Sequence, residues 1–199
     1  MERVLVHTCC APCLTGVHYR LKEEGYEAVS LWYNPNIHPF TEWERRLGEL
    51  LKYRGLTGIE VIVIDEYPLK KFLKGLIIAD ERGTEARCSY CIGMRLKRTA
   101  EEAKRRGFDY FTTTLLVSRH QPHELIRDLG RRIGRREGVK FLYIDFRKNW
   151  KDSVRISRSL HMYRQGYCGC ILSEAERYRV EWEEGKDYLK EKGVDIWFG

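Results

Sequence analysis

One pattern recurs along the chain and constrains its fold more than any other feature. A charged stretch with helical periodicity ends at a glycine, and a short apolar run follows. The glycines are Gly25, Gly58, Gly107 and Gly138, and the runs that follow them cover residues 28–33, 61–64, 109–112 and 139–144. Glycine at the end of a helix adopts the left-handed conformation that stops the helix. The runs are almost continuously apolar, β-branched or aromatic, which is typical of strands covered on both faces.

Apolar positions with helical spacing fill the segments between these runs. They are Leu14, Val17 and Leu21; Trp43, Leu47, Leu50 and Leu51; Phe72, Leu73, Leu76 and Ile77; and Ile92, Leu96, Ala100 and Ala103. With a first strand over residues 3–8, this alternation predicts a parallel sheet of about five strands with helices on both faces, an α/β fold of Rossmann-like type. We expect a single domain, with a core over residues 1–150 and a helical extension over residues 151–199.

Composition and charge narrow the class of protein. No apolar run approaches the roughly 18 residues that a membrane span needs, and a strand pattern begins at Met1 with no room for a signal peptide. We therefore expect a cytoplasmic protein with no membrane partner. The net charge of +7 suits a polyanion such as nucleic acid. The arginine-rich run over residues 131–136 adds little, because such runs are usually solvated helix faces.

Seven cysteines fall into three groups, which are Cys9, Cys10 and Cys13; Cys88 and Cys91; and Cys168 and Cys170. The first group directly follows the first strand, at the carboxyl edge of the sheet where ligands of such folds bind. Nucleotide enzymes place a glycine-rich loop there, but the chain has neither GxGxxG nor GxxxxGK[ST]. Cys88 and Cys91 are expected to open a helix with Ser89 as its N-cap, on the same edge.

Several interpretations of seven thiols are possible. Disulfides are disfavoured because seven is odd, and adjacent or i, i+2 cysteines pair poorly. Buried free thiols would account for one or two cysteines, and a structural zinc ion would use four and leave three idle. A [4Fe–4S] cluster also takes four thiolates, and the remaining three can then hold a second metal, expected to be iron, with an open position. We favour these two metal centres.

Residue alternation gives a first division of the thiols between the two centres. Neighbouring residues of an extended segment point in opposite directions, so Cys9 and Cys10 should serve different centres. On this basis the cluster is predicted to bind Cys10, Cys88, Cys91 and Cys170, and the second metal to bind Cys9, Cys13 and Cys168. For Cys168 and Cys170 to reach the carboxyl edge, residues 152–166 must cross over that edge.

Several motifs together make the chain resemble a known family. They are HTCCAPC at 7–13, YNPNIHP at 33–39, the segment from Arg87-Cys88 to Arg95-Leu96, TTTLLVS at 112–118 and QGYCGC at 165–170. In this arrangement the chain resembles the cobalamin-independent epoxyqueuosine reductases, the QueH family. It departs from the family pattern at Arg119 and His120, where a proline and an aromatic residue are expected after Ser118.

The resemblance implies a fold like that of the adenine-nucleotide α-hydrolases, with an iron–sulfur cluster beside a further metal. It also implies the last step of queuosine synthesis, which removes the epoxide oxygen of epoxyqueuosine in the anticodon loop of tRNA. The electrons would come from an unidentified donor, and a metal with an open position could bind the epoxide oxygen. Polar residues at the strand ends are candidates for binding substrate, namely Tyr33, Asn34, Asn36, Ser118 and Arg119.

Two other functions stay open at the level of sequence. A tRNA sulfur-transferase could use a similar fold and cluster, but it needs ATP, and the missing phosphate loop argues against it. A non-enzymatic iron–sulfur protein that binds RNA or senses redox state is the other alternative. Among the histidines, His7 lies within the first strand and is expected to be packed, with support of a metal ligand as the alternative. His38 and His120 are expected either as solvated loop residues or as proton donors.

Overall fold

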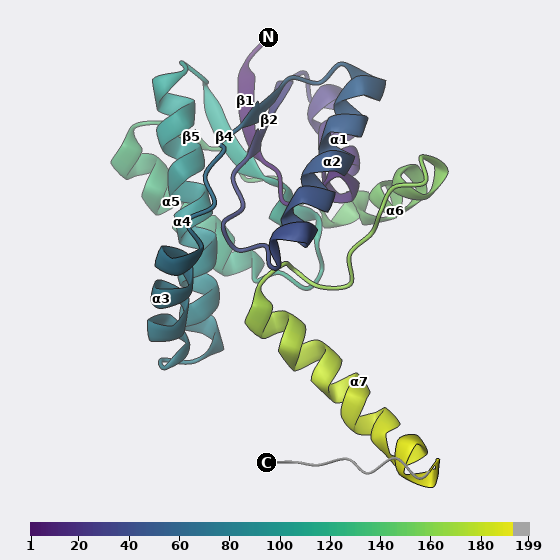
Figure 1. Ribbon diagram of the computed structural model, residues 1–199. Helices are drawn as coiled ribbons and strands as arrows, with labels where there is room; N and C mark the ends of the chain where they lie inside the picture. The colour runs from purple at the N-terminus through teal and green to yellow at the C-terminus, as the bar shows by residue number, and fades with distance from the viewer. Residues whose placement is uncertain (193–199) are drawn as a thin grey trace.

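The computed structural model describes residues 1–192 and is built around one parallel sheet of five strands (Figure 1). The strands are β1 (Arg3–His7), β2 (Glu27–Trp32), β3 (Val61–Val63), β4 (Tyr110–Thr113) and β5 (Lys140–Phe141). Their spatial order is β3-β2-β1-β4-β5, and every neighbouring pair is parallel. The predicted α/β fold of Rossmann-like type is therefore confirmed.

Helices cover both faces of this sheet. They are α1 (Ala11–Glu23), α2 (Phe40–Thr57), α3 (Leu69–Asp80), α4 (Thr84–Arg105), α5 (His123–Glu137), α6 (Trp150–Ser159) and α7 (Ile171–Glu191), with the short 3-10 helices η1 (Thr114–Val117) and η2 (Phe146–Asn149). In Figure 1, α1, α2 and α6 lie on one side of the sheet, whereas α3, α4 and α5 lie on the other. The last helix, α7, extends away from the sheet. No helix in the described range is long and apolar enough to cross a membrane.

The helix boundaries follow the predicted glycine signals. Gly58 ends α2 with a φ of 73°, and Gly138 ends α5 with a φ of 75°. Burial of α1 also follows its predicted face, since Leu14, Val17 and Leu21 are completely buried. These residues pack over β1, whose central residues are also completely buried, so α1 is held firmly against the middle strand.

The fifth strand is shorter than the sequence predicts. Regular strand covers only Lys140–Phe141 of the expected 139–144, although the Leu142 backbone N–H still donates to the carbonyl of Phe111 over 2.9 Å. This strand lies at the edge of the sheet, where it has a neighbour on one side only. The chain leaves the ladder after Leu142 and enters η2, so the apolar residues that follow pack without pairing as a strand.

Beyond the carboxyl ends of β1 and β4, the chain runs in opposite directions. The connection from β1 leads to α1 on one side of the sheet, whereas the connection from β4 leads to α5 on the other. This divergence is the topological switch point of an open parallel sheet, where ligands of such folds bind. Cys9, Cys10 and Cys13 follow β1 at this point.

Candidate metal centre

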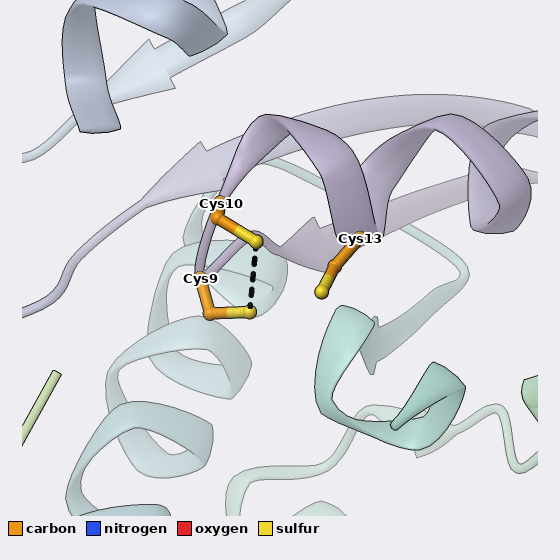
Figure 2. Close-up of side chains that lie close together, drawn as sticks. All are labelled: Cys9, Cys10 and Cys13. Atoms are coloured by element: carbon orange, nitrogen blue, oxygen red, sulfur yellow. Dashed lines mark hydrogen bonds between the residues drawn. The ribbon is translucent and has the colours of Figure 1, made fainter. Parts of the chain in front are cut away.

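Three thiols converge where β1 joins α1. Cys9 lies in the bend after the strand, Cys10 is the extended N-cap residue of α1, and Cys13 lies in the first turn of that helix. Their sulfur atoms all lie within 4.8 Å of one another, and the Sγ atoms of Cys9 and Cys10 are 3.9 Å apart. Figure 2 shows the three side chains directed toward one common point.

This convergence contradicts the expectation that Cys9 and Cys10 point in opposite directions. Alternation holds only while the backbone keeps strand geometry. Regular strand ends at His7, and the chain bends at Cys9 before α1 begins, so the two neighbouring side chains turn to the same side. The division of the seven thiols that rested on alternation loses this argument and stays a prediction.

Hydrogen bonds among the three thiols favour a single negative charge. The thiols of Cys10 and Cys13, followed by the hydroxyl of Thr114, lower the pKa of Cys9 well below its usual value. The hydrogen bond with Cys13 would lower the pKa of Cys10, but that with Cys9 and burial together raise it to about 12. The pKa of Cys13 is raised well above its usual value by its hydrogen bonds to Cys10 and Cys9. Three thiolates at this point therefore need a cation.

The spacing of the three sulfur atoms suits a metal ion. Metal–thiolate bonds of about 2.3 Å, as for zinc, place two tetrahedral ligands about 3.8 Å apart. The separation of 3.9 Å between the Cys9 and Cys10 sulfur atoms agrees with that geometry. Metal binding would release the remaining thiol protons, because the thiolate is the ligand. The donor set thus fits a thiolate-bound metal, with three protein ligands and room for a fourth.

The other four thiols converge less closely, since the described residues hold no further thiol group of comparable spacing. Cys88 and Cys91 lie on α4, and Cys91 packs with Cys170 in one buried cluster that also contains Phe72 and Leu76. Burial, together with the neighbouring cysteines at 168, 170 and 88, raises the pKa of Cys91 to about 12 against the opposing effect of Arg95. Burial also raises the pKa of the thiols at 88 and 170. Four thiols from α4 and the segment before α7 are therefore electrostatic neighbours.

The position of Cys88 and Cys91 on their helix differs from the prediction. The helix begins at Thr84 with Gly83 as N-cap, six residues before the predicted N-cap Ser89. The two thiols thus lie inside the helix rather than at its first residues, so the free N–H groups of the helix end are one turn away. A turn at Gly83, with a φ of 97°, allows the earlier start.

The segment 167–170 reaches the carboxyl edge, as the crossover prediction requires. The His38 backbone N–H donates to the carbonyl of Gly169 over 2.9 Å, in the loop between β2 and α2. Gly169 has a φ of 111°, and a Cβ atom there would lie 2.9 Å from Cγ1 of Ile37. Glycine is therefore needed to bring Cys168 and Cys170 this close to the loop.

Two buried arginines lie beside the thiol groups, and neither was given a role from the sequence. Arg95 donates from Nη2 to the sulfur of Cys91 over 3.2 Å and is 4% exposed. Arg46 is 1% exposed and donates to the carbonyls of Tyr167 and Cys168, each over 3.3 Å. Burial would lower the pKa of Arg46, but the charges of Cys10 and Glu42 raise it above its usual value.

The burial of both arginines could have been predicted from their positions on the apolar faces of their helices. Arg46 lies three residues after the buried Trp43 and four before the buried Leu50, on the apolar stripe of α2. Arg95 lies four residues after Cys91 on the buried face of α4. An arginine is rarely buried without an anionic or hydrogen-bonding partner, so its position on an apolar stripe indicates such a partner.

His7 is packed, as expected. Its Nδ1 is 2.8 Å from Oγ1 of Thr113, and its Nε2 is 3.1 Å from Oδ1 of Asn34. Burial, followed by the charge of Arg95, lowers the pKa of His7 to about 3, so the ring is neutral. Because the amide oxygen of Asn34 only accepts, Nε2 carries the proton. His7 thereby ties the end of β1 to both neighbouring strand ends.

The residues proposed to bind substrate lie at strand ends, with different degrees of exposure. Asn34 is buried and donates from Nδ2 to the carbonyl of Thr8 over 2.8 Å, so it supports the loop that carries the first thiols. Tyr33 and Asn36 are also buried, whereas Ser118 is half-buried and Arg119 is exposed. Their role in binding substrate stays a prediction.

Comparisons with known proteins agree with the site. The family model described as epoxyqueuosine reductase QueH matches residues 4–176. The epoxyqueuosine reductase QueH of Dehalococcoides mccartyi is 37% identical over 176 residues, which cover 88% of this chain and 94% of that protein. The protein of the same name from Thermotoga maritima is 36% identical over 184 residues, which cover 89% of this chain and 93% of the relative.

Among solved structures, the fold is similar to one described as a predicted subunit of tRNA methyltransferase from Methanocaldococcus jannaschii. The TM-score is 0.50 at 15% identity, and the match covers 80% of this chain and 76% of that one. This likeness supports the fold alone. The family match, in contrast, spans the sheet and all seven cysteines, and the chain belongs to the epoxyqueuosine reductase QueH family.

Proposed function

We propose that this chain reduces epoxyqueuosine to queuosine in tRNA. The observation that carries the proposal is the convergence of Cys9, Cys10 and Cys13 at the switch point of the sheet, within a chain of the QueH family. The site holds sulfur at the position where nucleotide-binding relatives of the fold hold a phosphate loop. No feature of the described residues favours the sulfur-transferase, which would need ATP.

The reaction is a two-electron reduction. Both C–O bonds of the epoxide break, a C=C bond forms between the two carbons, and the oxygen leaves as water after taking up two protons. An iron–sulfur cluster, when bound, would supply the two electrons one at a time. An external electron donor must return them, and that donor is unidentified. The chain's own part is to hold the thiolates, exclude water and orient the nucleotide.

The proposed cofactors are a [4Fe–4S] cluster and a second metal, expected to be iron. The sequence-based assignment gives the cluster Cys10, Cys88, Cys91 and Cys170. The convergence of Cys9, Cys10 and Cys13 supports an alternative that differs by one exchange, with Cys168 in place of Cys10. In that alternative the second metal has the three thiols that lie within 4.8 Å of one another.

Two substitutions distinguish these assignments. If Cys10 is a cluster ligand, Cys10→Ala should lose acid-labile sulfide, whereas Cys168→Ala should keep it. If Cys168 is the ligand, the results should be reversed. Cys88→Ala should lose sulfide in either case and serves as the control, because each thiolate of a cluster anchors one iron. Equal sulfide in all three variants, after anaerobic reconstitution, would contradict both assignments.

The function itself is tested by single turnover. The anaerobically purified protein, reduced with dithionite, should convert epoxyqueuosine tRNA to queuosine tRNA without ATP, as measured by mass spectrometry of the digested nucleosides. A protein that binds this tRNA and contains a reducible cluster, but yields no queuosine, would indicate the non-enzymatic alternative. A requirement for ATP would indicate the sulfur-transferase class.

A further inference from the structure

A basic hollow lies on the surface beside α6, close to the first thiol group. Its volume is about 540 Å³, and it is lined by Arg119, Trp150, Lys151, Val154, Arg155 and Arg158. No acidic side chain lines this hollow. The nearest acid along the helix is Asp152, whose Oδ1 lies 3.4 Å from Nη2 of Arg155. The hollow therefore has a strong excess of positive charge beside one indole ring.

The spacing on α6 places three of these cations on one exposed stripe. Lys151, Arg155 and Arg158 follow one another at intervals of four and three residues, and all three are exposed. The opposite side of α6 is fixed, because Ser153 and Ser157 are buried. A cationic stripe on a rigidly held helix suits a polyanion with regularly spaced charges, such as the sugar–phosphate backbone of RNA.

The hollow adjoins the thiol site. A smaller cavity of about 60 Å³ is lined by Pro12, Cys13, Trp150, Ser153, Val154, Arg164 and Gln165. Trp150 and Val154 line both spaces, so they separate the basic surface from the Cys13 thiol. Among the described residues, Ser153 Oγ and Gln165 Oε1 have no hydrogen-bond partner, and Ser153 is only 3% exposed. Unpaired polar atoms of this kind indicate a partner that the described residues do not supply.

We propose that the exposed stripe of α6, formed by Lys151, Arg155 and Arg158, binds the backbone of the substrate tRNA beside the target nucleotide. Trp150 stacks on an unpaired base at the entrance to the Cys13 cavity. Single-stranded loops are recognised in this way, by cations on phosphates and by aromatic rings on splayed bases. This inference rests on the proposed function, since it assigns the surface through which the same site receives its substrate.

The chain offers a closely matched control on its opposite edge. A second hollow of about 540 Å³ includes Arg131 and Arg135 of α5 in its lining. Because α5 ends before the start of the parallel strand β5, this arginine-rich end lies at the amino edge of the sheet, away from the thiols. If electrostatic attraction alone governed binding, the two surfaces would contribute equally to the affinity for tRNA. If the α6 stripe is the docking surface, it should contribute much more.

The experiment compares two variants that each lose three positive charges. One carries Lys151→Ala, Arg155→Ala and Arg158→Ala, and the other carries Arg131→Ala, Arg132→Ala and Arg135→Ala. Affinity for epoxyqueuosine tRNA is measured by fluorescence anisotropy across a range of salt concentrations, with anaerobically purified protein of equal sulfide content. Three lost phosphate contacts should make the log–log salt dependence shallower by about 2, and should weaken binding about ten-fold or more at moderate salt.

We expect the ten-fold loss of tRNA affinity in the α6 variant, and a change in affinity of less than about two-fold in the α5 variant. Trp150→Ala should weaken binding about ten-fold, and Trp150→Phe should restore most of it, because any aromatic ring can stack. Equal effects of the two triple variants, or no effect of the α6 variant, would overturn the inference. Since the readout is binding, a wild-type protein that binds tRNA but makes no queuosine would instead refute the proposed function and leave this surface standing.

Discussion

Replacing Arg46 with methionine tests whether this residue holds the Cys168 segment in place. The guanidinium donates from Nε to Glu42 over 2.6 Å and from its two terminal nitrogens to the carbonyls of Tyr167 and Cys168. It also lies 5.1 Å from the ring centre of Tyr167. Arg46→Met keeps much of the side-chain volume and removes every one of these polar contacts.

The expected loss of stability follows from the burial of the ion pair between Arg46 and Glu42. Removing one partner of a buried ion pair costs about 3–5 kcal/mol, because the other charge is left uncompensated. Glu42 keeps one hydrogen bond, from the hydroxyl of Tyr163 over 2.8 Å, and its side chain is 10% exposed. We therefore expect Arg46→Met to lower the free energy of unfolding by about 3 kcal/mol. This is a large share of the roughly 5–15 kcal/mol that stabilises a domain.

A double variant separates the charge from the carbonyl contacts. Glu42→Gln with Arg46→Met removes the uncompensated carboxylate, so unfolding in denaturant under anaerobic conditions should recover about 1–2 kcal/mol of the loss. The carbonyls of Tyr167 and Cys168 still lack their donor. Amide hydrogen exchange in the peptide covering 165–170 should therefore be faster in both variants than in the wild type.

The outcomes are distinct. If Arg46→Met costs less than about 1 kcal/mol and exchange over 165–170 is unchanged, Arg46 does not hold the segment and the argument fails. If stability falls but exchange in that peptide does not rise above the change in the rest of the chain, the arginine stabilises α2 alone. Glu101→Gln, in an exposed pair with Lys97 on α4, is the control, and it should cost under about 1 kcal/mol.

The interface between α1 and α6 and a buried histidine give two further predictions. Gly16→Ala would place a Cβ atom 2.3 Å from Oγ of Ser153 and 2.8 Å from the carbonyl of Asn149, so thermal unfolding should show about 1–3 kcal/mol of destabilisation. Burial lowers the pKa of His18, which contacts Tyr53, so the unfolded chain takes up a proton first as the pH falls below 6.5. The stability advantage of wild type over His18→Gln should then shrink by at most about 1.4 kcal/mol per pH unit, and a pH-independent difference would contradict this.

The parallel arrangement of the strands and the location of the site could be predicted because they depend on periodicity and chain direction. Four helix-terminating glycines and the apolar runs after them define parallel crossovers, and a residue that follows a strand must lie at the carboxyl edge. Cys9 and Cys10 were placed correctly on that evidence. The short β5 was not, because an apolar run at the sheet edge packs equally well without strand pairing.

Side-chain direction at the site could not be predicted from the same patterns. The convergence of Cys9 and Cys10 depends on a bend between β1 and α1, and no periodicity describes a bend. One position on α2 was also misjudged, although Trp43 and Leu50 are buried as predicted. Leu51 was expected on the buried face, yet it is 42% exposed, and Arg46 is buried on the stripe instead. Hydrophobicity alone favours leucine over arginine there, so only a partner supplied by the fold explains the choice.

The partners of the two buried arginines explain why a cysteine-rich site contains buried cations. Clustered thiols can bind metal only as thiolates, and burying several negative charges together is unfavourable without opposing charge. Arg46 faces Cys10 and the Cys168 segment, whereas Arg95 contacts Cys91 directly and lies close enough to His7 to lower its pKa. Each guanidinium brings a positive charge that can offset the charge of the thiolates. Two sequence signals therefore indicate the site, namely clustered cysteines and arginines on otherwise apolar helix faces. The arginines indicate which helices surround the cysteines.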